Sequence, residues 1–200
     1  MKHKRWEKAE RISAIVERKY GLRLEHCKSR SQLVKRYGSK LFELVNECYA
    51  PLYGYTPLTE KQIEQFIKMY IPVIDLRLIS LVVDADDNLI ALGVSIYSLA
   101  EALREAKGKL FPFGWWYLLK SMFWKKPDSL DLLLIGVRPD YQKRGVPTML
   151  FTDLIKTYNK LGFRYAETNA CLESNTKVRA LWEPFENEQH KKRWIFGKEF

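Results

Sequence analysis

The chain contains little cysteine and histidine, with three of each among its 200 residues. Cys27, Cys48 and Cys171 are odd in number and far apart, which suits neither a disulfide framework nor a zinc ribbon. We expect them to be reduced core residues. The sequence also contains no HExxH, GxSxG or GxxxxGK[ST] motif. These absences argue against a metalloprotease, a serine hydrolase and a P-loop nucleotide site, and we expect no metal.

A long hydrophobic run is also missing. The longest apolar stretch, residues 110–124, is interrupted by Lys120 and is shorter than the roughly 18 residues that suggest a membrane span. The basic N-terminus leads into an amphipathic pattern and not into the apolar core of a secretory signal. We therefore expect a cytoplasmic protein without a transmembrane segment.

Acidic residues are outnumbered by basic ones, 24 to 34, which gives a net charge of +10. Such a charge attracts anions, including coenzyme phosphates, acidic lipid and nucleic acid. A solvated basic surface explains the charge equally well. No nucleic-acid reading motif accompanies it, so nucleic acid is the least favoured of these partners.

The pattern of apolar residues predicts a mixed α/β chain. Helical spacing and candidate caps, among them Ser31, Ser98, the Thr59 capping box and Asn175, predict helices at residues 5–20, 31–50, 59–70, 98–106, 147–161 and 175–182. Alternating or continuous apolar runs predict strands at residues 22–27, 78–83, 89–97, 130–137, 164–170 and 193–200. The length favours one domain over residues 1–200.

The most informative stretch is residues 134–148, where a strand of buried type leads through a basic turn into a helix. Such a turn exposes backbone N–H groups at the positive end of a helix dipole, which favours a phosphate. In this stretch Val137, Pro139, Gln142 and Gly145 match the pattern V-x-P-x-x-[QR]-x-x-G-x-[GA]. The chain here resembles the GCN5-related N-acetyltransferase (GNAT) family.

That resemblance implies the acyl-coenzyme A N-acyltransferase fold, a mixed and mostly antiparallel central sheet flanked by helices. It implies transfer of an acetyl or other acyl group from acetyl-coenzyme A, or another acyl-coenzyme A, to an unknown amine acceptor. In this fold the central strands part, and the pantetheine arm of the coenzyme fills the gap between them. The residues implied to bind the coenzyme are Ile135, Gly136, Val137, Gln142, Lys143, Arg144, Gly145, Val146, Pro147, Thr148 and Asn175.

Two positions depart from the family pattern. Pro147 stands where glycine or alanine is usual, and it removes one N–H from the phosphate cradle, although proline is tolerated in a first helical turn. Trp182 stands where many members carry a tyrosine that protonates the departing thiolate, and an indole N–H is not a useful acid. These departures leave open a non-catalytic domain of the same fold that docks a partner or an anionic surface.

Acyl transfer needs a group that accepts the proton of the acceptor amine. Glu167, in the strand after the coenzyme-binding helix, is the candidate general base, since a charge there is costly unless it is paired or used. A structural ion pair with Lys or Arg explains Glu167 equally well. Asp131 and Glu173 are weaker candidates, because each fits a strand end or a helix cap.

A helical insertion at about residues 98–126 carries an aromatic segment, residues 111–124. It fits the wall of an acceptor pocket, or a membrane-surface segment with Lys120, Lys125 and Lys126 toward lipid phosphates. A core or domain-docking helix is the favoured explanation, because aromatic stripes are more often packing than recognition. The chain also resembles the C-terminal half of longer bacterial proteins with two such domains, so a second GNAT-like domain is a candidate partner.

Overall fold

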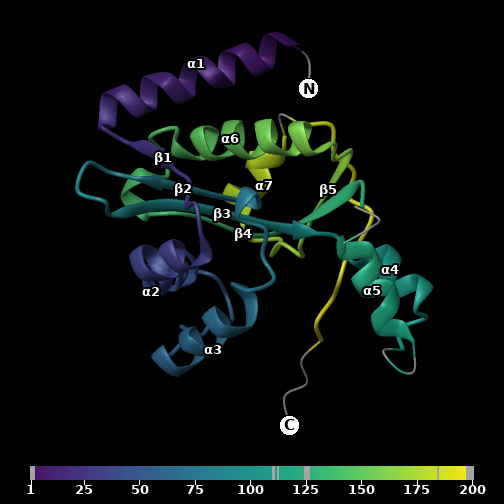
Figure 1. Cartoon of the computed structure of the whole chain (residues 1–200). Coiled ribbons are helices and arrows are strands. Elements are labelled where there is room, and N and C mark those ends of the chain that lie inside the picture. The colour runs from purple at the N-terminus through teal and green to yellow at the C-terminus, as the bar shows by residue number, and fades with distance from the viewer. Residues whose placement is uncertain (1–2, 110, 112, 124–126, 184, 197–200) are drawn as a thin grey trace.

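The computed structural model describes residues 3–109, 111, 113–123, 127–183 and 185–196 (Figure 1). Its centre is one five-stranded sheet in the order β1-β2-β3-β4-β5. The strands are β1 Arg23–Glu25, β2 Ile79–Val83, β3 Leu89–Tyr97, β4 Ser129–Val137 and β5 Tyr165–Thr168. The first three pairings are antiparallel, and β5 runs parallel to β4. The predicted mixed, mostly antiparallel sheet is therefore confirmed.

The helices follow the predicted order. They are α1 His3–Tyr20, α2 Arg30–Tyr49, α3 Glu60–Tyr70, α4 Ala100–Glu105, α5 Gly114–Phe123, α6 Val146–Leu161 and α7 Thr176–Trp182, with short 3-10 turns at η1 Leu76–Leu78 and η2 Pro139–Tyr141. The Thr59 capping box and the Asn175 cap are confirmed. Two predicted caps are wrong by one or two residues. The caps are Ser29, which accepts a hydrogen bond from the Gln32 amide, and Leu99, which lacks a side-chain cap.

Helices cover both faces of the sheet (Figure 1). Alternate residues of a strand point to opposite faces, so Val82 packs in a cluster with Leu150 of α6, while Leu81 packs in a cluster with Leu44 of α2. Helix α1 lies outside α6 and adds Val16 to the first cluster. Burial of each such side chain stabilises the fold by about 1.5–3 kcal/mol.

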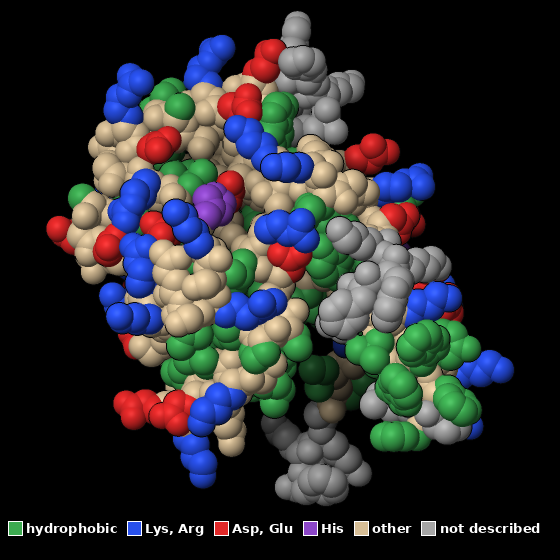
Figure 2. Space-filling view, in the orientation of Figure 1, with side chains coloured by type: hydrophobic (Ala, Val, Ile, Leu, Met, Phe, Trp, Pro, Cys, Tyr) green, Lys and Arg blue, Asp and Glu red, His purple; other side chains and the backbone are tan. Residues whose placement is uncertain are grey.

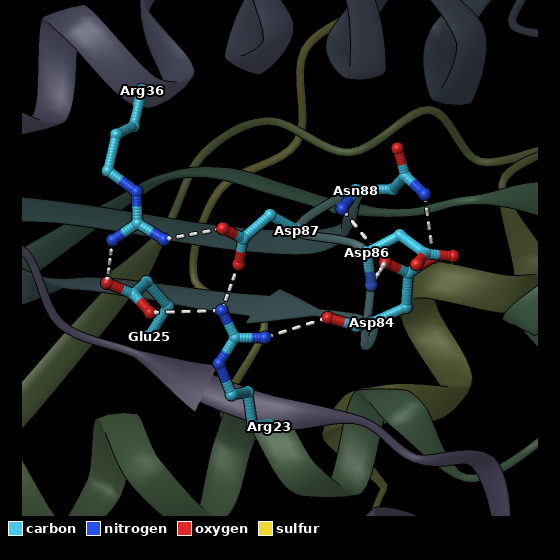
Figure 3. A network of polar contacts seen from close by, with 7 residues as sticks. All are labelled: Arg23, Glu25, Arg36, Asp84, Asp86, Asp87 and Asn88. Atoms are coloured by element: carbon cyan, nitrogen blue, oxygen red, sulfur yellow. Dashed lines mark hydrogen bonds and ion pairs between the residues drawn. The ribbon is translucent and has the colours of Figure 1, made fainter.

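A network of charged side chains holds the β1 edge of the sheet (Figure 3). Arg23 of β1 donates to the backbone oxygen of Asp84 at 2.7 Å and pairs with Asp87. Arg36 of α2 contacts Asp87 at 3.2 Å and Glu25 at 2.6 Å. The network ties α2, β1 and the β2–β3 turn together.

Two further predictions are corrected. Residues 193–196 form no strand with the described part of the chain, because the segment leaves the sheet after α7 and has no strand edge beside it (Figure 1). The rest of the strand predicted there, residues 197–200, lies outside the described residues. The three cysteines are free, but Cys171 is exposed and is not a core residue. No helix in the described ranges is both long and apolar enough to cross a bilayer.

Candidate functional site

Strands β4 and β5 separate halfway along β4. They pair only from Ser129 opposite Tyr165 to Leu132 opposite Thr168. Strand β5 ends there, while β4 continues to Val137 in contact with β3 alone. A register shift next to Val94 marks the same place, as expected where a strand bends away from its partner. The sheet therefore opens beside the second half of β4.

The pairing register shows which backbone groups of β4 face this opening. The Arg138 amide donates to the Ile90 oxygen at 2.9 Å, so Arg138 forms a hydrogen-bonded pair with β3. In an antiparallel ladder, hydrogen-bonded and non-hydrogen-bonded pairs alternate. The N–H and C=O groups of Ile135 and Val137 consequently point away from β3, toward the opening.

Side chains already contact all four of these groups, and the partner of the Val137 amide is the sulfur of Cys48. The Tyr49 hydroxyl, at the end of α2, donates to the Ile135 oxygen at 3.1 Å and accepts from the Ile135 amide at 3.4 Å. The Gln142 side-chain amide donates to the Val137 oxygen at 3.1 Å. Cys48 lies against Gly136, where its sulfur is 3.2 Å from the position of an added Cβ. The opening is thus lined by the last turn of α2.

These contacts leave both α2 side chains protonated. Burial raises the pKa of Cys48 to about 12, helped by the nearby charge of Glu47. Its thiol is therefore not a nucleophile at neutral pH. Burial also raises the pKa of Tyr49, although its hydrogen bond to Ile135 opposes the shift. Tyr49 remains a neutral hydroxyl that can donate a hydrogen bond.

The turn after β4 leaves several backbone amides at the start of α6 without a hydrogen-bond partner. In the described part of the chain, the amides of Lys143, Gly145 and Val146 donate no hydrogen bond. Pro147 has no amide hydrogen, and the Thr148 amide is used by the Gly145 oxygen at 3.0 Å. Val146 is fully buried, so two of the predicted cradle amides, those of Lys143 and Gly145, remain available to an anion next to the positive end of a helix of 16 residues.

Gly145 is required by its backbone and by its surroundings. Its φ of +80° lies in the left-handed region, and an added Cβ would come within 2.9 Å of Val16 on α1. The guanidinium of Arg144 stacks over the ring of Tyr20 on α1 and over that of Tyr141. Helix α1 therefore holds the turn in shape from outside.

Helix α7, which follows β5 in the chain, lies next to the turn after β4. The Lys177 ammonium donates to the Gln142 side chain at 3.1 Å. The side-chain oxygen of Asn175, predicted to touch the coenzyme, accepts from the Val178 amide as a helix cap. Trp182 packs edge-on against Phe151 of α6, with ring centroids 5.1 Å apart. Its indole nitrogen is buried and has no partner in the described residues.

Two carboxylates face each other across the last pairs of β4 and β5. Asp131 lies opposite Glu167, immediately before the strands separate. Glu167 contacts Lys191 at 3.1 Å and His190 at 2.9 Å. Burial raises the pKa of Glu167, but these two partners outweigh burial and the pKa is lowered. The pKa of Asp131 is raised, first by burial and then by the charge of Glu167, while a hydrogen bond with Ser98 opposes the shift.

The pKa of Asp131 is thus raised and that of Glu167 is lowered, although the two carboxylates lie opposite each other. Glu173, on the loop before α7, contacts Lys192 at 3.5 Å and is exposed. The ion pair that the sequence offered as one explanation of Glu167 is present, whereas the position of Asp131 opposite Glu167 depends on the register between β4 and β5. No sequence signal indicates Tyr49 either, because its position depends on how α2 crosses the sheet.

A shallow hollow of about 470 Å³ lies elsewhere, between the first turn of α2 and the end of α3. Its lining includes Arg30, Val34 and Ile71. Arg30 and Tyr49 stand at opposite ends of a 20-residue helix, about 30 Å long at 1.5 Å per residue. The hollow therefore lies away from the opening, and nothing in its lining suggests chemistry.

The residues present fit a ligand that has both a diphosphate and an extended amide-bearing arm. Unused amides lie at the start of α6, an unpaired strand edge lies beside them, and the indole N–H of Trp182 lacks an acceptor. Buried donors without a partner are rare in folded proteins, so an acceptor atom from a ligand is a natural explanation for Trp182. Coenzyme A has these parts.

Comparison with curated proteins gives two relatives. The chain is 29% identical over 162 residues to a bacterial ceramide synthase of Caulobacter vibrioides, covering 79% of this chain and 42% of that protein. It is 25% identical over 166 residues to Protein YghO of Escherichia coli, covering 80% of this chain and 42% of that protein. The chain thus spans less than half the length of either relative. No protein-family model matches the chain.

Solved structures with the same fold are acetyltransferases. One is an aminoglycoside acetyltransferase from an uncultured soil sample, with 12% identity, a TM-score of 0.52, and coverage of 89% of this chain and 97% of that chain. Another is a GCN5-related N-acetyltransferase from Kribbella flavida, with 18% identity, a TM-score of 0.51, and coverage of 82% and 80%. At these identities the likeness concerns the fold.

Proposed function

We propose that this chain, which has the fold of the GCN5-related N-acetyltransferases, moves an acyl group from an acyl-coenzyme A to an amine. The observation that carries the proposal is the opening between β4 and β5 next to the unused amides of Lys143 and Gly145. One ligand class, an acyl-coenzyme A, matches both features. It supplies a thioester carbonyl that an amine can attack.

The amides of Lys143 and Gly145 would hold the diphosphate, assisted by the positive end of α6. The exposed side chains of Lys143 and Arg144 add positive charge to the same turn. The second half of β4, residues 135–137, would pair with the arm along its open edge. Gln142 keeps the end of β4 fixed through its bond to Val137, and Lys177 holds Gln142 from α7.

Binding in this way requires a movement of Tyr49. Its hydroxyl takes both groups of Ile135 that an amide of the arm would otherwise pair with. The exchange is close to balanced, because the arm offers one donor and one acceptor in place of the hydroxyl. Tyr49 then remains beside the arm as the hydroxyl nearest to Ile135.

The two carboxylates divide the base function. Asp131 would accept the proton that the amine loses as its nitrogen attacks the thioester carbonyl, directly or through one water. The negative charge of Glu167 would raise the pKa of Asp131. Lys191 and His190 would fix the position of the Glu167 side chain. The amide bond forms, the C–S bond breaks, the departing sulfur takes a proton from water, and Asp131 returns the amine's proton to that water so that the base is regenerated. Trp182 would donate its indole N–H to that sulfur without acting as an acid.

The name of the Caulobacter relative indicates the class of acceptor. A ceramide is a long-chain amino alcohol whose nitrogen carries a fatty acyl group, so its synthesis from an acyl-coenzyme A is an N-acylation. We extend this class to the present chain and propose a long-chain amino alcohol as acceptor and a fatty acyl-coenzyme A as donor. A short acyl group on a water-soluble amine is the alternative within the same chemistry.

Calorimetry and a thiol-release assay test the proposal. We expect the chain to bind coenzyme A, and to release free thiol only when acyl-coenzyme A and an amine are both present. A fatty donor with a long-chain amino alcohol should give faster release than acetyl-coenzyme A with a water-soluble polyamine. Absence of any coenzyme binding would remove the proposal as a whole.

A second candidate is a domain of the same fold that binds without catalysing. It is favoured by the occupation of Ile135 by Tyr49 and by tryptophan in place of tyrosine at position 182. Coenzyme binding without thiol release, across both kinds of donor and acceptor, would support this second candidate.

A further inference from the structure

The α4–α5 hairpin, residues 100–123 in the described chain, stands out from the body of the molecule (Figure 1). It lies between β3 and β4. Helix α5 has its main contacts with α4 and no comparable contact with another described element. Ala102 and Gly114 are buried where the two helices meet. An added Cβ on Gly114 would come within 1.7 Å of the Lys109 oxygen, so the hairpin is a defined unit and not a loose loop.

The outer surface of the hairpin is aromatic. Phe111 is 78% exposed, Phe113 is 70% exposed and Trp116 is 48% exposed. The other large exposed apolar side chains of the hairpin are Leu103, Trp115, Tyr117 and Leu119. Figure 2 shows these hydrophobic side chains gathered at the projecting end, with basic side chains beside them. A helix that is apolar on most sides is normally buried, so α5 needs a partner.

Basic side chains outnumber acidic ones on the hairpin, whose two acidic residues, Glu101 and Glu105, both lie on α4. Between Ala106 and Lys126 the sequence contains five lysines and no acidic residue; the lysines are Lys107, Lys109, Lys120, Lys125 and Lys126. The first three lie in the described residues and are exposed. A positively charged aromatic surface complements a negatively charged apolar one.

We propose that the α4–α5 hairpin binds the surface of an anionic lipid bilayer. Aromatic side chains of Trp and Tyr sit at the boundary between headgroups and acyl chains, and lysines extend their charged ends to the phosphates. The centre of a protein–protein interface is also aromatic but is depleted of lysine. The combination of several exposed aromatics with several lysines, and no acidic residue on α5 itself, therefore favours lipid over a protein partner.

The inference goes beyond acyl transfer and does not depend on it. Lipid binding by the hairpin uses no residue of the β4–β5 opening or of the turn at residues 143–146. If the acceptor is a long-chain amine, the hairpin would also keep the chain at the membrane where such a molecule dissolves. Binding and transfer are measured separately, so the failure of one is distinguishable from the failure of the other.

Vesicle sedimentation of the 200-residue chain tests the inference. We expect the chain to sediment with phosphatidylcholine vesicles that contain phosphatidylglycerol, and much less with phosphatidylcholine alone. About 1 M NaCl should release it, because the Debye length then falls to about 3 Å. These comparisons use the unaltered chain, so they do not depend on a variant being folded. Sedimentation that ignores both lipid charge and salt, or no sedimentation, overturns the proposal.

Variants then assign the binding to the hairpin. Lys107→Gln with Lys109→Gln should weaken partition by at least tenfold, at about fivefold for each lysine removed. The matched control, Lys35→Gln with Lys61→Gln, removes two exposed lysines from α2 and α3 and should leave partition nearly unchanged. Equal losses in the two double variants would show a general charge effect and overturn the assignment.

The aromatic part has its own control. Trp115→Ser with Trp116→Ser should reduce partition at least tenfold, whereas Tyr53→Ser, which alters an 89% exposed side chain on another loop, should not. Thermal melts check that each variant folds. Light scattering measures the oligomeric state and so tests whether the hairpin is instead a self-association surface. If the chain is a dimer that the Trp115 and Trp116 changes dissociate, and vesicles are not bound, the hairpin is a self-association surface and the proposal is wrong.

Discussion

The two edges of the sheet differ in the partners that their polar groups have. At the β1 edge, Arg23 and Arg36 meet the carboxylates of Glu25 and Asp87, and the backbone of the turn is bonded as well (Figure 3). At the β4–β5 edge, backbone groups of β4 face an opening, and they are met by side chains from α2 and from the following turn. One edge is closed by permanent partners within the fold, and the other by partners that a ligand can replace.

This difference indicates where the chain keeps its function. Charged pairs at an exposed edge protect it against pairing with other strands and contribute modestly to stability. An edge that opens within a sheet leaves backbone donors and acceptors unpaired by strands, which costs free energy unless something uses them. We therefore expect changes near the opening to alter binding and rate, and changes at β1 to alter stability alone.

The largest expected effect is on the catalytic rate, and it comes from changing the carboxylates that lie where β4 and β5 separate. Asp131→Asn removes the proton acceptor, and we expect kcat to fall about 100-fold or more. Asp128→Asn, a neighbouring exposed carboxylate outside the pair, should leave kcat nearly unchanged. Thiol release measures both. A similar kcat for Asp131→Asn and the unaltered chain would exclude Asp131 as the base.

Glu167→Gln tests the same pair through pH. Asp131 must be ionised to act, so activity falls as pH drops through its raised pKa. Removing the charge of Glu167 lowers the pKa of Asp131, and the acidic limb of the pH profile should move to lower pH. A limb that stays in place would show that the two carboxylates are not coupled. Loss of activity with no shift would assign the base function to Glu167 itself.

The next effect is on coenzyme binding, from two glycines at the ends of α6. Gly145 and Gly162 have φ of +80° and +81°, so alanine strains the backbone by a similar amount at each. Only at Gly145 would an added Cβ also meet Val16, and only Gly145 contributes one of the unused amides. We expect Gly145→Ala to weaken coenzyme A binding at least tenfold and Gly162→Ala to leave it unchanged, by calorimetry. Equal effects would mean that the turn does not bind the diphosphate.

A smaller effect of opposite sign is expected at Tyr49. Tyr49→Phe removes the hydroxyl that occupies Ile135 in the ligand-free chain. The variant loses two hydrogen bonds in the ligand-free state, so its free energy of unfolding should fall by about 1–2 kcal/mol. The coenzyme-bound state does not contain these two bonds, so coenzyme A should bind several-fold more tightly to the variant. Urea melts and calorimetry measure the two. Weaker binding would show that the hydroxyl itself contacts the coenzyme.

The smallest effect is expected at the closed edge. Asp87→Asn weakens the pairs with Arg23 and Arg36. These side chains are exposed and salt screens them, so the melting temperature should fall slightly at low salt, and the difference should vanish at high salt. Coenzyme binding and kcat should not change. A change in either would show that the two edges are coupled through β2 and β3.

The sequence was sufficient for the parts of the fold that depend on local patterns. The Thr59 capping box, the left-handed glycines at positions 21 and 162 and the apolar run at 130–137 each indicate structure within a few residues, although the strand at 130–137 is mostly half-buried and not fully buried as its type predicts. The cap at Ser29 was misplaced because several nearby serines qualify. The final strand was wrong at residues 193–196 because a strand also needs a partner, which no local pattern reveals.

The site was predictable only in part for the same reason. The turn at residues 137–145 carries its own motif, so its position follows from the sequence. The meeting of Tyr49 with Ile135 joins residues 86 positions apart, and the pairing of Asp131 with Glu167 depends on a register between parallel strands. Both are properties of packing and topology. The available amides of the turn likewise depend on which of them the first turn of α6 uses.

The most direct test of the central claim is an amide NMR titration of the chain with coenzyme A. We predict large shifts for the amides of Lys143 and Gly145 and for Ile135, with little change at Gly162 or in the β2–β3 turn. Shifts confined to other regions, such as the hollow between α2 and α3, or no shifts at saturating coenzyme, would contradict it.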